Sequence, residues 1–458
     1  MAVIDLGEER YDAPADPVPP RRLRRRRLRT TALVLAGALV LGAGGAAPPV
    51  APLLTELYRA PLDAGGDFTV AGDRLFVTEP LDGGGHRVSG YDLGRGRQLW
   101  SGTYRIEQQV GLYPHDGLLM VVEQGRPQNR PFHTVVLDAA TGQLRVSVQS
   151  PLTVLPEERV ALVVEEIFPP GSRVDPDNPP PVTTPIYHAS RGSGMYTAPS
   201  LGETGRVIDL DTGRDLWTSP LVAGIATVPA AAGRPTALLT GQRDGRLELR
   251  DVRTGAVRQR IDPAASPPRY AEVTGDSVLV RFESHVAVYS ADLRQRRWFR
   301  AMPADQGSVN VCGPILCLTR QDPTGVEALD PLTGDAVWRI TDQGWLTQHG
   351  IHLVEYGLDG TVRRAVDPHT GRTMLDLTGW TETSGYSSTA PLLLLRRTRS
   401  GERTWLGLLD PEGTTVRPLD PLPFVVSSCQ VTTGALACRT QFGDLRAWRF
   451  RPQPTPAE

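Results

Sequence analysis

Residues Ile208–Trp217 read IDLDTGRDLW, and close copies of this stretch recur along the chain. Tyr91–Trp100 reads YDLGRGRQLW, and Ala328–Trp338 reads ALDPLTGDAVW. In each copy an apolar run ends near an aspartate, a turn with a glycine follows, and a second short run ends on a tryptophan. Copies of one pattern at wide intervals indicate a repeated unit of structure.

Pairs of Asp and Gly four residues apart mark the successive units. They are Asp92/Gly96, Asp138/Gly142, Asp209/Gly213, Asp251/Gly255, Asp330/Gly334 and Asp367/Gly371. Asp410 and Gly413 give a version one residue shorter, and the sequence around Asp292 gives a version without the glycine. The spacing corresponds to a period of about 40 residues, interrupted by one long insertion.

The residue types of the repeated turn have a mechanical explanation. An Asp side chain can accept hydrogen bonds from backbone N–H groups two residues ahead, which closes the turn. The glycine supplies the positive φ that a short hairpin loop with a bulge requires. The tryptophan four residues later, at Trp100, Trp217 and Trp338, is large enough to pack between neighbouring sheets. We therefore expect the motif to be architectural and to join the last two strands of each unit.

Alternating apolar and polar residues, as in Val326–Asp330, predict strands in every unit. Four-stranded units of about 40–45 residues in a row are typical of a β-propeller. The ALDPLTGDAVW pattern resembles the repeat of the pyrroloquinoline-quinone-type (PQQ-like) propellers, over nearly all of residues 55–450. The resemblance implies an all-β ring of four-stranded blades, and it extends to non-enzymatic members that act as scaffolds for partners.

The number of blades is open between eight and nine. Eight full units run from about residue 64 to 422, and residues 424–450 supply three further strands. The fourth strand of that remnant could come from Leu53–Leu62, which would close the ring and leave no free sheet edge. A literal count gives nine blades, but family precedent favours eight, and eight is the number that we expect.

The N-terminal segment predicts a membrane anchor. Arg21–Arg29 contains seven arginines, and no charged residue follows from Thr30 to Thr55. About 20 apolar residues span a bilayer, and arginines on one flank place that flank in the cytoplasm. We expect a cytoplasmic tail (1–29), a transmembrane signal anchor (30–54), an extracytoplasmic propeller (55–452) and a disordered tail (453–458). A secretory signal cleaved near Gly44–Ala47 is the alternative.

The four cysteines form two local pairs, Cys312 with Cys317 and Cys429 with Cys438. Facing cysteines of a β-hairpin lie within reach of a disulfide, which agrees with export. A zinc site would need closer spacings, with histidine or more cysteine nearby. We expect one disulfide between the first two strands of each cysteine-bearing unit, and no metal.

The long insertion runs from Phe168 to Gly205 and is rich in proline and glycine. This composition favours a loop without regular structure, and long loops on a rigid scaffold often carry function. Its candidates for partner binding are Tyr187, His188, Arg191 and Tyr196. The alternative is a flexible surface excursion without a binding role.

No catalytic constellation is recognisable in the sequence. The chain contains no lysine, and its cysteines are not adjacent, unlike the vicinal pair of quinone-dependent dehydrogenases. His349 and His352 are expected to be two loop histidines without a metal. A formal net charge of −2 gives no indication of nucleic-acid binding. We expect a non-enzymatic envelope module without a cofactor that binds a protein, peptide or glycan; a propeller enzyme is the alternative.

Overall fold

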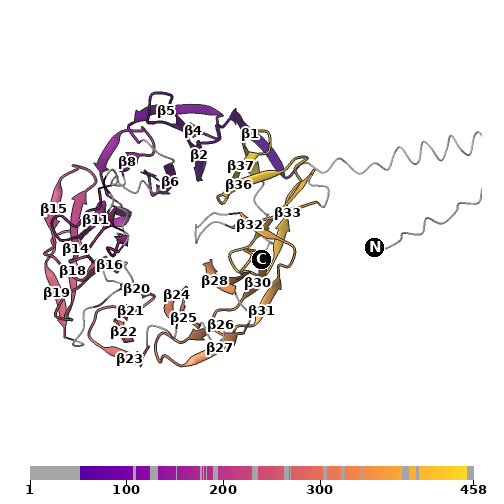
Figure 1. Ribbon diagram of the computed structural model, residues 1–458. Coiled ribbons are helices and arrows are strands. Elements are labelled where there is room, and N and C mark those ends of the chain that lie inside the picture. Colours follow the sequence, from indigo (N-terminus) through magenta and orange to yellow (C-terminus); the bar gives the residue numbers. More distant parts are fainter. Residues whose placement is uncertain are drawn as a thin grey trace, which may run out of the picture. The chain divides into compact units, whose positions relative to one another are not determined.

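The computed structural model describes residues 52–450, apart from 107–109, 124–132, 151, 176–177, 179, 182, 189–193, 229–235, 263–267, 269, 303–306, 321–324, 342–343, 384–390 and 399–401. Strands of the described residues form nine four-stranded antiparallel sheets and one two-stranded hairpin. The nine sheets follow one another around a ring as blades (Figure 1). In each blade the first strand lies at the centre of the ring.

The first three blades run from β2 to β15. A single helical turn among the described residues, η1 (Pro156–Glu158), lies between the first two strands of blade 3. Blade 1 is β2 (Asp67–Ala71), β3 (Arg74–Pro80), β4 (His86–Asp92) and β5 (Arg97–Tyr104). Blade 2 is β6 (Val110–His115), β7 (Leu118–Glu123), β8 (Thr134–Asp138) and β9 (Leu144–Val148). Blade 3 is β10 (Leu152–Leu155), β11 (Val160–Ile167), β14 (Gly202–Asp209) and β15 (Asp215–Thr218), with the insertion between β11 and β14.

The next three blades are regular meanders of four consecutive strands. Blade 4 is β16 (Gly224–Val228), β17 (Ala237–Gly241), β18 (Leu247–Asp251) and β19 (Val257–Ile261). Blade 5 is β20 (Tyr270–Thr274), β21 (Ser277–Arg281), β22 (His285–Ser290) and β23 (Arg296–Ala301). Blade 6 is β24 (Ser308–Cys312), β25 (Ile315–Arg320), β26 (Gly325–Leu329) and β27 (Ala336–Ile340).

The last three blades include the one that joins the two ends of the ring. Blade 7 is β28 (Gly344–His349), β29 (His352–Gly357), β30 (Val362–Val366) and β31 (Thr373–Asp376). Blade 8 is β32 (Thr381–Thr383), β33 (Leu392–Arg397), β34 (Thr404–Leu409) and β35 (Val416–Pro418). Blade 9 is β36 (Val426–Val431), β37 (Ala435–Thr440), β38 (Asp444–Phe450) and, as its outermost strand, β1 (Leu54–Pro61).

The prediction of eight blades is therefore wrong, and the literal repeat count is right. The degenerate unit around Asp292 forms a complete blade, because Leu293 takes the positive φ of the missing glycine at +58°. The remnant at the C-terminal end forms the ninth blade, because β1 pairs with β38 from Leu54↔Phe450 to Pro61↔Asp444. The N-terminal strand thus closes the ring, as the sequence suggested.

The hydrophobic core is divided among the junctions between blades. Buried apolar side chains form nine clusters, and each cluster joins two neighbouring blades. Alternate residues of β33, the second strand of blade 8, face opposite neighbouring blades. Leu392 and Leu394 pack toward blade 7, whereas Leu393 and Leu395 pack toward blade 9. Since both faces of these strands are covered, their sequences are continuous apolar runs.

The repeated Asp–Gly turn has the geometry that its sequence indicates. Asp209 Oδ1 accepts hydrogen bonds from the backbone N–H groups of Asp211 and Thr212, at 3.1 and 2.9 Å. The bond from the Thr212 backbone is the main cause that lowers the pKa of Asp209. Gly213 lies at φ +68° and donates its N–H to the Asp209 carbonyl at 2.8 Å.

Four of the other predicted turns repeat this geometry, and their aspartates are Asp138, Asp251, Asp330 and Asp367. Each side chain accepts the N–H two positions ahead, as the sequence indicated, and also the N–H three positions ahead. The side chain of Asp92 accepts the N–H of Arg95, three positions ahead. The glycines of the same turns have φ between +62° and +76°, and they are Gly96, Gly142, Gly255, Gly334 and Gly371.

A tryptophan of the outermost strand locks several blades to the turn of the next one. Trp338 donates its indole N–H to the carbonyl of Pro368 at 2.7 Å, and its ring lies against Gly371. The same bond joins Trp100 to Ala139, Trp217 to Val252 and Trp298 to Pro331. The motif that decides the fold therefore connects blades as well as strands.

The turn glycines differ in what lies against them, a difference that the sequence did not predict. A Cβ would lie 2.5–2.7 Å from a tryptophan ring of the preceding blade at Gly142, Gly255, Gly334 and Gly371. At Gly96 and Gly213 the nearest atoms would instead be the carbonyl oxygens of Leu57 and Arg145, at 3.5 and 3.2 Å. Close approach by an indole is therefore a second reason for glycine at four of these six turns.

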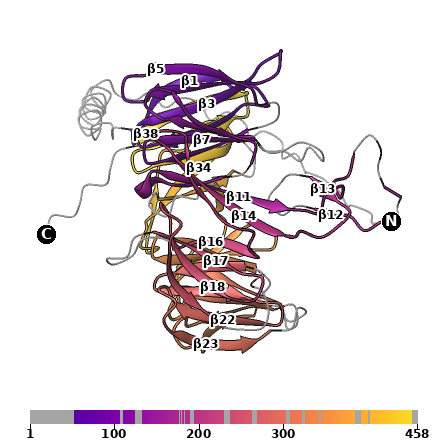
Figure 2. The same cartoon turned by 90° about the vertical axis from the view of Figure 1, so that its left-hand side faces the viewer.

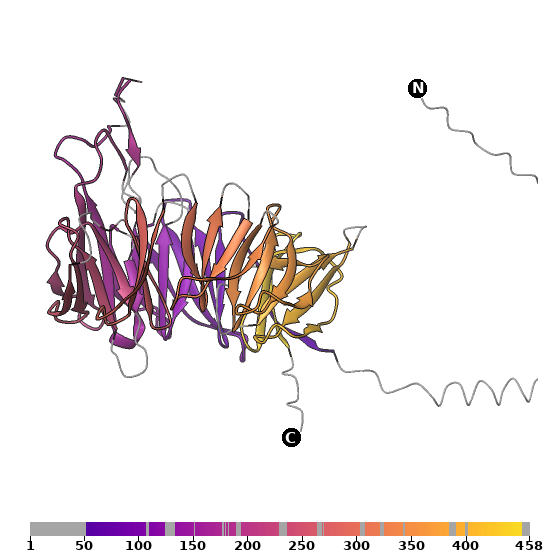
Figure 3. The ribbon, with the colours of Figure 1, turned by 90° about the horizontal axis from the view of Figure 1, so that it is seen from below.

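Two disulfides join the first two strands of blades 6 and 9, Cys312 to Cys317 and Cys429 to Cys438. Cys429 and Cys438 are both fully buried in the cluster between blades 8 and 9. We define the turn face as the face with the first-to-second and third-to-fourth strand turns. The insert face is the opposite one, with the second-to-third strand loops and the insertion (Figure 3).

We expect the two disulfides to contribute unequally to stability. Blade 9 holds both ends of the ring, so an opening of its first hairpin also releases the closing strand. Cys429→Ser/Cys438→Ser should lower the free energy of unfolding by about 2–3 kcal/mol, and Cys312→Ser/Cys317→Ser by less. Urea unfolding followed by tryptophan fluorescence measures both; equal losses would contradict the special role of blade 9.

Candidate functional site

The insertion stands on an extended pair of strands. β11 and β14 pair over eight positions, from Val160↔Asp209 to Ile167↔Gly202. The corresponding strands of blade 4, β17 and β18, pair over five, from Ala237↔Asp251 to Gly241↔Leu247. The added pairs form a stalk that carries the insertion away from the insert face of the ring (Figure 2).

The insertion has regular structure of its own, contrary to the sequence-based expectation. β12 (Tyr187–His188) and β13 (Met195–Tyr196) form a short antiparallel hairpin. Tyr196 stacks on Phe168 at the foot of the insertion, with ring centroids 3.6 Å apart. The Val174 N–H donates to the Met195 carbonyl at 2.8 Å and connects the hairpin to the segment before it. Aromatic stacking and these backbone bonds compensate for the high proline content.

Three of the four predicted partner-binding residues lie on this hairpin. Tyr187 lies opposite Tyr196, and His188 opposite Met195. The side chain of Tyr187 is 41% exposed, whereas Tyr196 is half-buried in its stack with Phe168. Arg191 lies outside the described residues. Of the two tyrosines, Tyr187 is thus the one that a partner could reach more directly.

Exposed apolar side chains surround the insertion. Ile186 and Tyr187 belong to the hairpin, Leu201 to the end of the insertion, and Leu221 to the connection into blade 4; each is 37–41% exposed. Leu201 and Leu221 lie close together at the foot, because the Glu203 N–H and the Val222 carbonyl are joined at 2.8 Å. Isolated exposed leucines are ordinary, but the closeness of Leu201 and Leu221 below a hairpin with two more exposed apolar residues favours an interaction surface.

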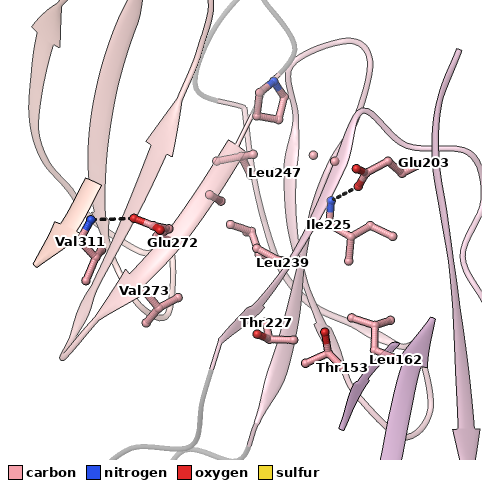
Figure 4. Close-up of a pocket in the computed structure, with 15 residues that line it drawn as sticks. Thr153, Leu162, Glu203, Ile225, Thr227, Leu239, Leu247, Glu272, Val273 and Val311 are labelled. Carbon is pink, nitrogen blue, oxygen red and sulfur yellow. Dashed lines mark hydrogen bonds between the residues drawn. The ribbon is translucent and has the colours of Figure 1, made fainter. Parts of the chain in front are cut away.

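A cavity of about 460 Å³ lies at the foot of the insertion, along the central strands of blades 3–6 (Figure 4). Its lining is mainly aliphatic, with two carboxylates. The residues are Thr153, Leu162, Glu203, Gly224, Ile225, Ala226, Thr227, Leu239, Gly241, Leu247, Pro268, Ala271, Glu272, Val273 and Val311. Its volume falls in the usual range for ligand sites, about 300–1,000 Å³.

The residues of the repeated turn do not contribute to this cavity. None of them is among its described lining residues. The glycines concerned are Gly96, Gly142, Gly213, Gly255, Gly334 and Gly371, which lie in third-to-fourth strand turns on the turn face. The cavity instead opens beside the insertion, so the repeated motif and the candidate site are separate features of the chain.

The two carboxylates of the cavity are positioned by the backbone of the next blade. Glu203 Oε2 accepts the N–H of Ile225 at 3.0 Å, and Glu272 Oε2 accepts the N–H of Val311 at 2.7 Å (Figure 4). Both glutamates are half-buried. Each therefore bridges two blades while its carboxylate lines the cavity.

Similar bridges connect central strands elsewhere in the ring. Gln430 of blade 9 accepts hydrogen bonds from Thr69 and the Val70 N–H, at 2.6 and 3.3 Å. Burial raises the pKa of Asp67 and outweighs the hydrogen bonds that its carboxylate accepts from the backbone of Phe68 and Leu112. These side chains accept hydrogen bonds from backbone N–H groups of the innermost strands. Without such partners, these edge strands could pair with a strand of another chain.

His349 and His352 are a paired position of a hairpin rather than two loop histidines. They face each other across β28 and β29, and their side chains are 4% and 0% exposed. His352 Nδ1 lies 3.0 Å from the Pro411 carbonyl, and its ring packs on Gly413. It thereby occupies the place that tryptophan takes at other blade junctions. Burial lowers the pKa of His349 to about 4 and also lowers that of His352.

No group of three or more possible metal ligands is present among the described residues. Within the same part of the chain, no helix has the length and apolar character needed to span a membrane. The predicted anchor lies outside that part, except for its last three residues, 52–54. The anchor thus stays a prediction from the sequence.

Comparisons with known proteins find one matching family model and several similar solved structures. A family model described as outer membrane protein assembly factor BamB matches residues 171–340. No curated protein sequence matches the chain. Among solved structures, BamB from Moraxella catarrhalis is 14% identical, covers 88% of this chain and 99% of its own, and has a TM-score of 0.40.

Two other solved structures show a similar likeness. A eukaryotic initiation factor is 11% identical, covers 89% of this chain and 92% of its own, and has a TM-score of 0.49. Sqt1 from Saccharomyces cerevisiae is 9% identical, covers 81% and 97%, and has a TM-score of 0.41. At such low identities these likenesses carry no function to the chain. The repeated turn, the four-stranded blades and the matching family model together identify the chain as a PQQ-like repeat β-propeller.

Proposed function

We propose that the chain is a scaffold of the cell envelope that binds another protein through its insert face. The observation that carries the proposal is the set of exposed apolar side chains on the insertion and at its foot, where a cavity lined by Glu203 also lies. A partner that covers Ile186, Tyr187, Leu201 and Leu221 would remove this apolar surface from water. The family model that matches residues 171–340 is described as an assembly factor, which supports partner binding.

The position of the N-terminal strand supports a defined orientation for this scaffold. β1 begins at Leu54, opposite Phe450, at the turn-face end of β38. The insertion leaves the ring on the opposite face. If residues 30–54 anchor the chain in a membrane, the turn face lies toward that membrane and the insert face points away from it. A partner outside the cytoplasm would then meet the insertion first.

A catalytic role is the second candidate, and it would need reactive groups in the cavity. Glu203 and Glu272 each accept a backbone hydrogen bond from a neighbouring blade, which accounts for their positions without catalysis. We therefore favour binding over catalysis. Dye reduction by the purified protein with pyrroloquinoline quinone, calcium and simple alcohols or sugars would support the enzyme instead.

Removal of the insertion should abolish partner binding and leave the propeller stable. Replacing residues 169–200 by Asn-Gly keeps the Ile167↔Gly202 pair at the outer end of the stalk. A loop on the surface of a rigid scaffold changes stability little with its length, so we expect a loss of less than about 1 kcal/mol in urea unfolding.

Binding is measured by the amount of partner protein recovered with a tagged full chain. The chain is cross-linked in the cells that produce it and then purified from their membranes. We expect the recovered amount of the principal partner, quantified by mass spectrometry, to fall at least about 10-fold in the variant. This corresponds to about 1.4 kcal/mol of binding free energy. Unchanged recovery of the same partners would refute the insert face as the docking surface. A large loss of stability would show instead that the insertion covers the blades.

A further inference from the structure

We propose that mild acid opens the junction between blades 7 and 8 through the buried pair His349 and His352. The side chains of these residues are 4% and 0% exposed, and their ring centroids lie 5.4 Å apart. Both rings lie at the turn-face end of blade 7, where His352 packs on Gly413 of blade 8. Because histidine ordinarily titrates between pH 5 and 8, such a pair can couple the junction to pH. The inference goes beyond the proposed function and does not depend on it.

The hydrogen bond of His352 fixes the position of its proton. Its Nδ1 lies 3.0 Å from the carbonyl oxygen of Pro411, which can only accept, so Nδ1 carries the hydrogen. The backbone N–H of Ile351 reaches the same oxygen at 3.3 Å. In the neutral ring Nε2 is then an unprotonated acceptor, and acid adds the second proton there.

Acid would place this second N–H in surroundings that do not accept it. Neither His349 Nε2 nor His352 Nε2 has a hydrogen-bond partner among the described residues, and both atoms are buried. An N–H buried without a partner costs free energy, and an unpaired buried charge costs more. Protonation is therefore favourable only when the turns of blades 7 and 8 separate and water reaches the rings.

One carboxylate of blade 8 lies close enough to affect both rings. Burial and the neighbouring ring lower the pKa of His349 to about 4, and burial also lowers the pKa of His352. The negative charge of Asp410 acts in the opposite direction. Its oxygens already accept the N–H and hydroxyl groups of Thr414 and the hydroxyl group of Thr415, at 2.8–2.9 Å. The carboxylate therefore compensates only in part for the burial of the rings.

The other elements around the pair carry their charges elsewhere. In the same turn of blade 8, Glu412 is exposed. After β30 comes Asp367, whose carboxylate accepts two N–H groups of its own turn. Residues nearer the insert face than the pair are Glu355 of β29, Glu382 of β32, and Arg396 and Arg397 of β33. Residues 384–390, outside the described part, include no acidic or basic residue. Among the described residues, Asp410 is thus the charged group that faces the pair.

Another junction holds a group that does not titrate in the same place. Trp338 of blade 6 donates its indole N–H to the turn of blade 7 and packs on Gly371 there. His352 makes the same two contacts with the turn of blade 8. An indole N–H is a donor only and takes up no proton. We therefore expect acid to act on the junction of blades 7 and 8 and to spare that of blades 6 and 7.

The direction of the pH effect follows from the protons that each state binds. In the opened junction the rings are in water and have the ordinary histidine pKa of 6.5, whereas in the closed junction the pKa of His349 is about 4. Between these values the opened junction binds more protons, so a falling pH favours opening. For this ring alone, the opened population should rise about 30-fold between pH 7.5 and pH 5.0.

Hydrogen exchange measured by mass spectrometry on the full chain in detergent tests the inference. The rates at pH 7.5 and pH 5.0 are corrected for the intrinsic effect of pH on exchange. We expect opening in segments 344–357 and 404–418 to increase at least about 10-fold in acid. Opening in segment 325–340 of blade 6, which the tryptophans hold, should increase less than about 3-fold.

The variant His349→Gln/His352→Asn removes both titrations. The asparagine amide can donate to the carbonyl of Pro411 in place of Nδ1. We expect the increase in segments 344–357 and 404–418 to fall below about 3-fold in this variant. His369→Asn is the matched control, because it removes an exposed histidine from another turn of blade 7. It should keep the full response to acid.

An equal response of segments 325–340 and 344–357 in the unaltered chain would overturn the inference, because it would mean that acid loosens the whole ring. A full response in the His349→Gln/His352→Asn variant would overturn it as well. If that variant does not fold, the comparison of the two segments in the unaltered chain and in His369→Asn decides. No partner takes part in the measurement, so its result leaves the proposed docking surface untouched.

Discussion

Deletion of Leu54–Pro61 from the full chain should abolish cooperative folding of the propeller. β1 is the outermost strand of blade 9, and it is the only N-terminal strand in a sheet whose other strands come from the C-terminal end. It buries Leu54 between blades 8 and 9 and forms an ion pair between Arg59 and Asp444 at 2.8 Å. The Leu54 N–H also donates to Asp420 of blade 8 at 2.9 Å.

The expected loss exceeds about 5 kcal/mol, a large part of the stability of an ordinary domain. It follows from the loss of one edge strand and from the opening of the ring at both junctions of blade 9. A synthetic peptide of residues 53–62, added in excess, should restore part of the cooperative transition. If the deleted form unfolds at the same urea concentration as the intact chain, closure by β1 contributes nothing and the account of blade 9 is wrong.

Gly371→Ala should cost about 3–4 kcal/mol, because two separate penalties act at this residue. Gly371 lies at φ +66°, a conformation that strains any residue with a Cβ. A Cβ there would also lie 2.6 Å from Cδ2 of Trp338, which packs on the turn from blade 6. The alanine must therefore displace the indole and weaken its 2.7 Å bond to Pro368.

Gly72→Ala is the matched control for this substitution. Gly72 lies at φ +59°, but a Cβ there would meet no atom within 4 Å. It should therefore show the backbone penalty alone, about 1–2 kcal/mol. The difference between the two variants in urea unfolding measures the packing of tryptophan on glycine at a blade junction. Equal losses would mean that this packing does not stabilise the ring.

The sequence predicts the blade well, because the blade depends on short-range chemistry. The Asp–Gly turn, its positive φ and the tryptophan that follows all act within one unit or between adjacent units. A literal count of the repeats predicts nine blades, as the structure has, but it requires a degenerate unit to be counted as a full blade; the expected eight followed family precedent instead. Leu293 illustrates the difficulty: without a glycine its unit looks degenerate, yet the residue takes a φ of +58°.

The contacts of the turn glycines also depend on the assembled ring. Gly334 follows the degenerate unit, yet it receives Trp298 of that unit as closely as Gly142 and Gly255 receive Trp100 and Trp217. Gly96 follows β1 of the closing blade and meets the Leu57 carbonyl instead. Six equivalent positions in the sequence therefore have two kinds of neighbour, and the strand that precedes each turn in space decides between them.

The sequence does not predict the cavity, because its lining residues come from separate blades. Glu203 lies at the end of the insertion and Glu272 in β20, and only the ring brings them to one cavity. The sequence offers one weak signal, an acidic residue in the middle of the short central strand Tyr270–Thr274. His352 was also misassigned, since its packing on Gly413 becomes visible only when blades 7 and 8 lie together.

Site-specific photo-cross-linking tests the proposed docking surface most directly. A photoreactive phenylalanine analogue would replace Tyr187 on the insertion or Leu332 on the turn face, which are 41% and 56% exposed. Both variants keep a large apolar side chain at an exposed position, so folding should be unaffected. We predict a discrete cross-linked partner at position 187 in whole cells, and none at position 332. A partner captured at 332 and not at 187 would contradict the central claim that the insert face binds the partner.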